Sequence, residues 1–319
     1  MTFGIQQLDR NSIETARQVL GRGGLVAIPT ETVYGLAADA NNAQAVAKIF
    51  DAKQRPSFNP LISHFAEAQQ AFTQVIATPL AQKLAQMFWP GPLTLVLPLT
   101  SNHQVSGLAN NGLGTHAVRV PQVQPDLRDL LAQFPAGLAA PSANPSGRLS
   151  PTTAQQVQRG LGGKVDLILD AGPCQVGLES SIVDLSTPQP RLLRLGGIPR
   201  VALEDVLGPL RDDLTPERVK APGQLKSHYA PSKPIRINVS QPSGDPGTWF
   251  LDFGEAVASG QQSLNLSPNS DLVEAAANLF AYLAQLDNDP AVKAIEVAPI
   301  PDQGLGQAIN DRLQRASSD

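Results

Sequence analysis

The chain has 319 residues, 42% of them hydrophobic and 16% charged, and a formal net charge of −4. This length favours two domains, and the acidic balance argues against a protein that coats nucleic acid, although a local basic pocket is compatible with it. A lone cysteine, Cys174, excludes an internal disulfide and disfavours a thiolate zinc site. We expect a cytoplasmic protein, because no apolar run is long enough to cross a membrane and the first residues lack a secretory pattern.

Helices and strands alternate irregularly through the first two thirds of the chain. Ser12 is expected to cap a first helix that ends at Gly21, and a second helix over 43–50 leads to Lys53. A buried strand over 25–28 lies between these helices. Further strands are predicted at 93–97, 117–120, 165–169, 181–185 and 192–195, and helices at 81–87, 126–134 and 153–159. This mixture predicts an α/β or α+β fold rather than an all-β sandwich.

The composition changes near Thr215. Three prolines and no apolar period between Ala221 and Pro234 indicate a linker. Beyond the linker, strands are predicted at 235–239, 248–251 and 295–297, and helices at 272–286 and 306–315. We therefore predict a domain over residues 1–214, a linker over 215–234 and a smaller domain over 235–319.

The segment from Lys53 to His64 is the most informative part of the chain. It gathers Lys53, Arg55, Asn59 and His64 around two prolines that stiffen the backbone. An arginine fork binds phosphate oxygens in pairs and a lysine acts as a point charge, so the segment suits a nucleotide phosphate. A solvated turn after a helix is the alternative, and the segment alone is compatible with both.

Small polar side chains follow two predicted buried strands. Ser142 and Asn144 lie between prolines, where they could donate to phosphate or ribose oxygens, or form a turn before the next helix. Thr30-Glu31-Thr32 comes directly after the strand over 25–28. Open α/β sheets bind ligands at the carboxyl ends of their strands, although an N-cap is the simpler explanation of this segment.

Charged residues also interrupt predicted strands and turns. Arg119 lies inside a predicted strand and must face solvent or a partner. Glu179 and Arg194 have ordinary explanations as a turn residue and as a strand residue on a solvated face. No GxxxxGK[ST], GxGxxG or GxSxG motif occurs, so a bound nucleotide would need a non-standard phosphate site.

Taken together, the ordered motifs of this chain resemble those of the Sua5/YrdC/YciO family, in which Lys-x-Arg and Ser-x-Asn pairs are the hallmark. The motifs are Pro29-Thr30-Glu31-Thr32-Val33-Tyr34-Gly35-Leu36, Lys53-x-Arg55-Pro56, Asn59-Pro60-Leu61-x-x-His64, Trp89-Pro90-Gly91-Pro92-Leu93-Thr94, Val118-Arg119-Val120-Pro121, Pro141-Ser142-Ala143-Asn144, Gly177-x-Glu179-Ser180 and Leu193-Arg194-Leu195-Gly196. Two later motifs resemble the longer, two-domain Sua5 branch. They are Pro222-Gly223-x-x-x-x-His228-Tyr229-Ala230-Pro231 and Gly304-Leu305-Gly306-x-Ala308-Ile309-Asn310-Asp311-Arg312.

The resemblance implies a fold and an activity. The expected fold is α/β: a twisted mixed-sheet domain with a large concave cavity, plus a small Rossmann-like C-terminal domain. The expected enzyme is a nucleotidyltransferase that joins L-threonine, bicarbonate or CO2, and ATP to make threonylcarbamoyl-AMP, with release of pyrophosphate. A downstream tRNA-modifying transferase complex would use this product to form threonylcarbamoyladenosine at position 37 of tRNAs.

The resemblance also assigns roles to residues of this chain. Lys53, Arg55, Ser142 and Asn144 would be the catalytic set. The ATP-binding set would be Lys53, Arg55, Asn59, Thr115, Ser142, Asn144, Ser150, Arg194 and Tyr229. The threonine-binding set would be Thr32, His64, Arg119 and Ser180, with Arg119 paired to the substrate carboxylate. We expect Mg²⁺ to arrive with ATP, with no protein side chain as a metal ligand and no organic cofactor.

Two alternatives and one hypothesis accompany this interpretation. An RNA-binding protein is the main alternative, and weak RNA binding is left open, but the acidic charge and the few aromatic residues disfavour it. A relative that makes an adenylate from carbamoyl phosphate is the second alternative, and the C-terminal motifs argue against both. We also hypothesise that the linker, which carries His228 and Tyr229, closes over the cavity as a lid; the plainer view is a simple tether.

Overall fold

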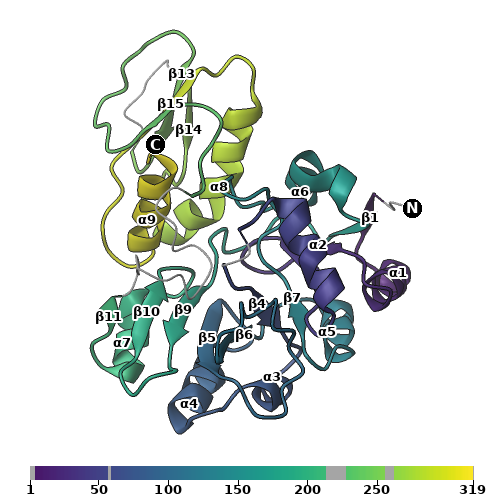
Figure 1. Cartoon of the computed structure of the whole chain (residues 1–319). Helices are drawn as coiled ribbons and strands as arrows, with labels where there is room; N and C mark the ends of the chain where they lie inside the picture. Colours follow the sequence, from purple (N-terminus) through teal and green to yellow (C-terminus); the bar gives the residue numbers. More distant parts are fainter. Residues whose placement is uncertain (1–3, 57–58, 213–227, 256–261, 319) are drawn as a thin grey trace.

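The computed structural model describes residues 4–56, 59–212, 228–255 and 262–318. Two sheets organise these residues: a mixed eleven-stranded sheet and a parallel four-stranded sheet (Figure 1). In sheet order, the strands of the large sheet are β1 (Ile5–Gln7), β8 (Leu167–Asp170), β2 (Val26–Ile28), β3 (Gly35–Asp39), β7 (Leu138–Ala139), β4 (Ile62–His64), β6 (Thr115–Arg119), β5 (Leu93–Pro98), β9 (Ser181–Asp184), β10 (Arg191–Arg194) and β11 (Arg211–Asp212).

The predicted helices of the first domain are present with small shifts of their ends, and two further helices accompany them. They are α1 (Arg10–Gly21), α2 (Ala43–Lys53), α3 (Ala68–Gln74), α4 (Pro79–Phe88), α5 (Pro125–Ala132), α6 (Ala154–Leu161) and α7 (Arg200–Leu207). The expected cap of the first helix was wrong. Asp9 is the N-cap and accepts a hydrogen bond from Ser12 N (2.8 Å), while Ser12 Oγ accepts one from Asp9 N (2.9 Å). This capping box satisfies two backbone donors at once, so the helix begins before its apolar stripe does.

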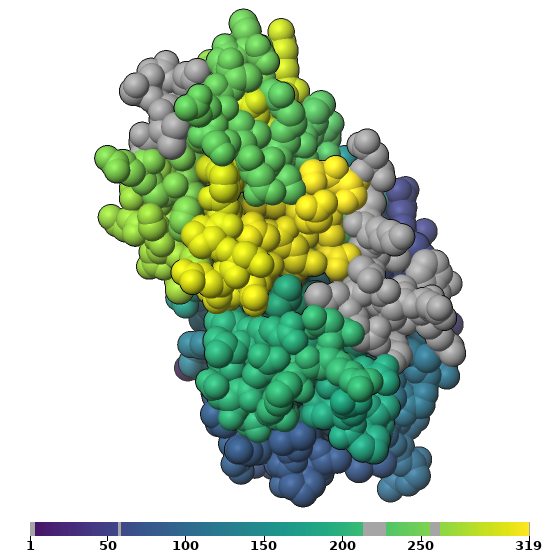
Figure 2. Space-filling model, turned by 90° about the vertical axis from the view of Figure 1, so that its left-hand side faces the viewer, coloured from purple at the N-terminus to yellow at the C-terminus, as the bar shows by residue number. Residues whose placement is uncertain are grey.

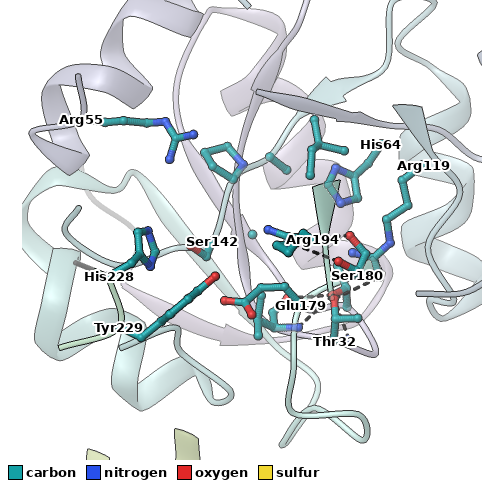
Figure 3. A pocket seen from close by; sticks show the side chains of 16 residues that line it. Thr32, Arg55, His64, Arg119, Ser142, Glu179, Ser180, Arg194, His228 and Tyr229 are labelled. Atoms are coloured by element: carbon teal, nitrogen blue, oxygen red, sulfur yellow. Dashed lines mark hydrogen bonds between the residues drawn. The ribbon is translucent and has the colours of Figure 1, made fainter. Parts of the chain in front are cut away.

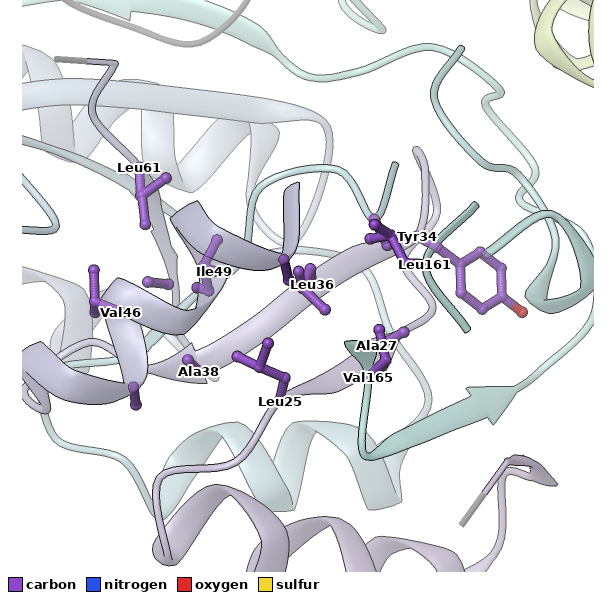
Figure 4. Close-up of a cluster of buried hydrophobic side chains, with 14 of the residues drawn as sticks. Leu25, Ala27, Tyr34, Leu36, Ala38, Val46, Ile49, Leu61, Leu161 and Val165 are labelled. Carbon is purple, nitrogen blue, oxygen red and sulfur yellow. The ribbon is translucent and has the colours of Figure 1, made fainter. Parts of the chain in front are cut away.

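A buried apolar cluster fixes the position of α2 over the large sheet. Leu36 of β3, Ile49 of α2 and Leu61 are fully buried in it, beside Leu25 and Val46 (Figure 4). Each such side chain contributes roughly 1.5–3 kcal/mol by leaving water. The cluster therefore fixes the position of Lys53, at the C-terminal end of α2, relative to the large sheet.

Strand register brings distant polar side chains to one face of the large sheet. β4 and β6 are parallel, with His64 opposite Arg119. Ile62, two residues before His64, points to the same face because side chains alternate along a strand. β9 runs parallel to β5 and pairs Ser181 with Leu93, so Ser180 lies at the same end of the sheet as Gly91.

The second sheet forms a small domain of parallel strands and helices, as the Rossmann-like expectation required. Its elements are β12 (Ile235–Arg236), β15 (Ala294–Val297), β13 (Thr248–Asp252), β14 (Ser263–Asn265), α8 (Leu272–Asn288) and α9 (Gly306–Ala316). β12 is shorter than predicted, and the polar strand β14 was not predicted. Residues 215–227 of the predicted linker lie outside the described residues, so the proposed domain boundaries stay predictions.

The two domains pack against each other through an apolar cluster. Val33 and Leu178 of the first domain join Leu279 and Ile309 of the second, with Tyr229 among them. Figures 1 and 2 place α9 directly against the β9–β11 region. Of the helices that the structure describes, none has the length and apolar character needed to span a bilayer.

Candidate active site

A cavity of about 40 Å³ lies over one face of the large sheet (Figure 3). Most of the side chains that carry chemistry in this cavity come from segments far apart in the sequence. The polar lining residues are Thr30, Thr32, Arg55, His64, Arg119, Ser142, Glu179, Ser180, Arg194, His228 and Tyr229. The cavity therefore brings together eight predicted site residues from every predicted set: Thr32, Arg55, His64, Arg119, Ser142, Ser180, Arg194 and Tyr229.

Arg119 is the centre of a buried network on the side of the cavity nearest the Thr30–Val33 segment. Its Nη2 donates to Thr32 Oγ1 at 2.9 Å and lies 2.7 Å from Glu31 Oε2, while its Nε donates to Gly91 O at 3.2 Å. The Oγ1 atoms of Thr30 and Thr32 are 2.8 Å apart. Arg119 and Glu31 are both buried, so the ion pair holds the guanidinium at the end of β6 with little freedom to move.

Ser180 joins this network to Arg194. Ser180 Oγ lies 2.7 Å from Thr94 Oγ1 and accepts a hydrogen bond from Arg194 Nη2 at 3.0 Å. Arg194 Nε donates to Ser180 O at 2.9 Å. Two guanidinium groups are thus held in fixed positions beside the same cavity, Arg119 by an ion pair with Glu31 and Arg194 by hydrogen bonds to Ser180.

Arg55 faces the same cavity from the opposite side (Figure 3). Its Nε donates to Asn59 O at 3.3 Å and its Nη2 to Pro60 O at 3.1 Å. Burial and the charge of Arg194 lower the pKa of Arg55 to about 9, despite an opposing effect of Tyr229. Asn59 is fully buried behind Arg55, and its side-chain amide has no partner among the described residues.

Lys53 does not line the cavity. Its Nζ donates to Ser142 O and to Asn144 O, both at 2.5 Å, and the residue is 1% exposed. Burial, followed by the charge of Arg55, lowers the pKa of Lys53 well below its usual range. The two hallmark pairs are therefore connected by hydrogen bonds from the Lys53 side chain to backbone carbonyls, which hold the Ser142–Asn144 loop in place. The expected contact of Lys53 with phosphates stays a prediction.

Asn144, Ser150 and Thr115 also lie outside the cavity lining. Asn144 Nδ2 donates to Pro145 O and Arg148 O, both at 2.8 Å, and Asn144 lines an adjacent groove together with Ser150. Thr115 begins β6 and pairs with Pro98. Their predicted roles toward ATP stay predictions, since none of the three lines the cavity beside Arg55 and Arg194.

The end of the predicted linker closes one side of the cavity. Tyr229 is 1% exposed with a φ of 64°, and its ring centroid lies 4.1 Å from that of His228 and 5.5 Å from that of Phe280. Ala230 N donates to Gly147 O at 2.9 Å, which holds this segment beside the Ser142–Asn144 loop. The position of both side chains is compatible with the lid hypothesis, while movement of the linker stays a prediction.

Three polar lining residues were outside the predicted binding sets: Thr30, Glu179 and His228, the last of which appeared only in the lid hypothesis. Glu179 stood in a quoted motif but was explained there as a turn residue. Its Oε1 accepts a hydrogen bond from Ser150 Oγ at 2.6 Å, and its Oε2 from Arg312 Nε at 3.0 Å. In the sequence, the signal for a role of Glu179 was its position as a polar motif residue directly before a predicted buried strand. Only the fold shows that Arg312 pairs with it.

The histidines of the site are uncharged at neutral pH. Burial is the main cause that lowers the pKa of both His64 and His228 to about 3, and the nearby arginines act in the same direction. Within the described ranges, no group of three or more His, Cys, Asp or Glu side chains could hold a metal ion. The two carboxylates beside the cavity, Glu31 and Glu179, are each paired with an arginine.

Comparison with known families now defines the class of protein. Residues 18–196 match the family model Sua5_yciO_yrdC, which is described as "Telomere recombination". The chain therefore belongs to the Sua5/YciO/YrdC family, as its motifs predicted. Residues 198–318 match a second model, described as "Threonylcarbamoyl-AMP synthase, C-terminal domain", so the chain has the two-domain architecture of the Sua5 branch.

Individual relatives agree with this placement over the full length of the chain. Threonylcarbamoyl-AMP synthase of Pyrococcus abyssi is 38% identical over 98% of this chain and 96% of that protein. Threonylcarbamoyl-AMP synthase of Bacillus subtilis is 37% identical over 96% of this chain and 92% of that protein. The crystal structure of P. abyssi Sua5 complexed with L-threonine superposes with a TM-score of 0.87 at 35% identity, covering 98% of this chain and 96% of that one.

Proposed function

We propose that the chain is a threonylcarbamoyl-AMP synthase. The reaction joins L-threonine, bicarbonate or CO2, and ATP, and releases pyrophosphate. The observation that carries the proposal is the convergence of Arg55, Arg119 and Arg194 with hydroxyl-bearing side chains in one enclosed cavity. Full-length relatives with this name, and a related structure with bound L-threonine, support the assignment.

The chemistry requires positioning more than a protein nucleophile. The ammonium of threonine loses a proton to solvent, and the resulting amine attacks the carbon of CO2, forms an N–C bond and releases a second proton to solvent, which yields a carbamate. A carbamate oxygen then attacks the α-phosphorus of ATP, and the bond to the β-phosphate oxygen breaks with release of pyrophosphate. Both steps need water excluded, reactants aligned and negative charge stabilised. A buried site rich in arginine and hydroxyl groups meets these needs.

The threonine is assigned to the side of the cavity around Arg119. Its carboxylate would pair with the Arg119 guanidinium, whose orientation Glu31 and Gly91 already hold. Thr32 and Ser180 would accept or donate hydrogen bonds to the remaining polar groups of the substrate. His64 lies at the end of the adjacent strand, and its low pKa leaves it neutral, so it adds no charge that repels the substrate ammonium.

The nucleotide is assigned to the side around Arg55 and Arg194. Their guanidinium groups would bind the phosphate oxygens, with Ser142, Asn59 and Tyr229 nearby. Asn144, Ser150 and Thr115 would reach the nucleotide only after a local rearrangement, and Lys53 would act through the Ser142–Asn144 backbone. Mg²⁺ would travel with the triphosphate, which supplies its own oxygen ligands.

The product would leave the cavity for a downstream transferase complex that modifies adenosine 37 of tRNA. This role places the protein in the cytoplasm. Weak RNA contact would be incidental to it, since the substrates are small molecules.

One assay tests the proposal: pyrophosphate release from ATP in bicarbonate buffer, with and without L-threonine. We expect release that depends on threonine. Release that needs carbamoyl phosphate and no threonine would favour the carbamoyl-transfer alternative. An inactive protein that binds RNA with steep salt dependence would favour the RNA-binding alternative.

A further inference from the structure

The C-terminal domain reaches the cavity wall through one buried arginine. Arg312 of α9 is 1% exposed, its Nε lies 3.0 Å from Glu179 Oε2, and its Nη2 donates to Leu195 O at 2.6 Å. Glu179 lines the cavity, and Leu195 follows Arg194 in the chain. Helix α9 thus places a cation directly behind the wall that carries Glu179 and Arg194, where Figure 1 shows α9 beside β9 and β10.

Two further close contacts lie beside the ion pair between Arg312 and Glu179. Gly177 has a φ of 72°, and a Cβ atom at this position would lie 2.4 Å from Ala276 O of α8. The loop before Glu179 therefore approaches α8 more closely than any other residue would permit. On the other side, the guanidinium carbon of Arg312 lies 5.1 Å from the ring centroid of Tyr229, within the range of a cation–π contact.

Glu179 needs a cationic partner because it is a buried carboxylate. Burial would raise its pKa, but the charges of Arg312 and Arg194 and the hydrogen bond from Ser150 outweigh this effect and lower the pKa to about 2. Glu179 is therefore ionised, and two arginines act on it electrostatically. One of them, Arg194, also lines the cavity.

We propose that Arg312 is a positioning residue for the nucleotide: it neutralises Glu179, so that Arg194 is directed at the phosphates and not at this carboxylate. The inference rests on the proposed function, because it assumes that Arg194 binds ATP. It also gives the C-terminal domain a definite part in the reaction, since helix α9 of that domain supplies the arginine that forms an ion pair with Glu179.

The test compares Arg312→Gln with the double variant Glu179→Gln/Arg312→Gln, both in the full-length chain. Glutamine at 312 keeps a donor for Leu195 O but removes the charge. We expect Arg312→Gln to raise the KM for ATP about tenfold while the KM for threonine changes less than threefold. The double variant should recover most of this loss, because no ionised carboxylate is left to attract Arg194. Arg312→Lys, which keeps the charge without the fork, should fall between wild type and Arg312→Gln.

Controls separate this inference from the proposed function and from simple misfolding. Arg236→Gln removes a C-terminal arginine that pairs with Glu296 inside its own domain, and it should leave both KM values unchanged. Direct titration with ATP should reproduce the change in affinity without turnover. If wild type releases no pyrophosphate with threonine, the proposed function fails. If wild type is active and Arg312→Gln has the wild-type KM for ATP, or the double variant is no better than Arg312→Gln, this inference is overturned.

Discussion

The two walls of the cavity differ in how their polar groups are satisfied. The threonine wall, defined by Thr32, Arg119 and Ser180, is bonded internally: each side chain has a protein partner at 2.7–3.0 Å. The nucleotide wall, defined by Arg55 and Ser142 with Asn59 buried behind Arg55, has fewer hydrogen bonds within the protein. Arg55 bonds two backbone carbonyls, and the buried amide of Asn59 has no partner in the part of the chain that the structure describes.

This difference indicates how each wall would act on its ligand. A wall held by its own hydrogen bonds and an ion pair is preorganised, so it selects a small substrate by fixed geometry. A buried amide without a partner is costly in a folded protein unless a ligand or water bonds it. We therefore expect loss of a threonine-wall residue to harm both folding and threonine binding. Loss of a nucleotide-wall residue should harm ATP binding and reduce stability less.

The largest effect is expected for Arg119→Ala on the threonine wall. It removes the partner of the substrate carboxylate, so the Kd for threonine should rise about 100-fold, equal to ~3 kcal/mol. It also leaves Glu31 buried without its ion pair, so the melting temperature should fall. Isothermal titration and thermal unfolding measure the two effects. Adding Glu31→Gln should restore stability but not binding, and an unchanged threonine affinity in Arg119→Ala would contradict the assignment.

The matched change on the nucleotide wall is Arg55→Ala. The Kd for ATP should rise by about tenfold or more, since a charge-assisted contact with phosphate is lost. The free energy of unfolding should fall less than in Arg119→Ala, because Arg55 bonds only backbone carbonyls and its removal leaves no buried carboxylate without an ion pair. Titration with ATP and urea unfolding test this pair of outcomes. A strongly destabilised Arg55→Ala protein would remove the distinction between the walls.

Stability should also depend on pH through histidines on and near both walls. Burial is the main cause that lowers the pKa of His64, His116 and His228 to about 3 in the folded state. Between the ordinary histidine pKa of about 6.5 and this value, the unfolded chain binds protons and the folded chain does not. Stability is therefore complete above that ordinary pKa and is lost as pH falls, by ~1.4 kcal/mol per pH unit for each histidine.

Urea unfolding at pH 7.5 and 5.5 measures this dependence. His116 Nε2 lies 2.8 Å from Ser63 Oγ, and His116 does not line the cavity. His116→Gln should therefore reduce the dependence of unfolding free energy on pH by the contribution of one histidine. A free energy of unfolding that does not change over this range would show that these rings are already protonated or are exposed when folded.

The smallest change in stability is expected for Asn59→Ala. The variant loses buried volume but also loses an amide that has no described partner, and the two terms should offset to within about 1 kcal/mol. ATP affinity should fall severalfold if the amide bonds the nucleotide. Differential scanning calorimetry measures the change in stability, and titration with ATP measures the change in affinity. Destabilisation well beyond this range would mean that the amide is already bonded within the folded chain.

Regular amphipathic segments were predictable, whereas two of the short buried strands, β4 and β7, were not. α2, α4 and α8 carry apolar stripes over several turns, so their positions follow from periodicity. β4 and β7 have three and two residues and are wholly buried, which leaves no alternation to detect. The register of β4 with β6 is equally invisible in the sequence, yet it places His64 beside Arg119. The family resemblance predicted a binding role for both residues, and the sheet explains why they lie together.

By itself, the amino-acid sequence determined which side chains are available for chemistry, because motif residues and helix periodicity are local properties of the chain. Only the tertiary structure decided which of them share one enclosed space. It turned Lys53 onto the carbonyls of Ser142 and Asn144, and it set Arg312 against Glu179, 133 positions earlier in the chain. The physical reason is burial. A cation that is removed from water is stable only where oxygen atoms of the folded chain accept its hydrogen bonds, and those atoms can belong to residues at any distance along the sequence.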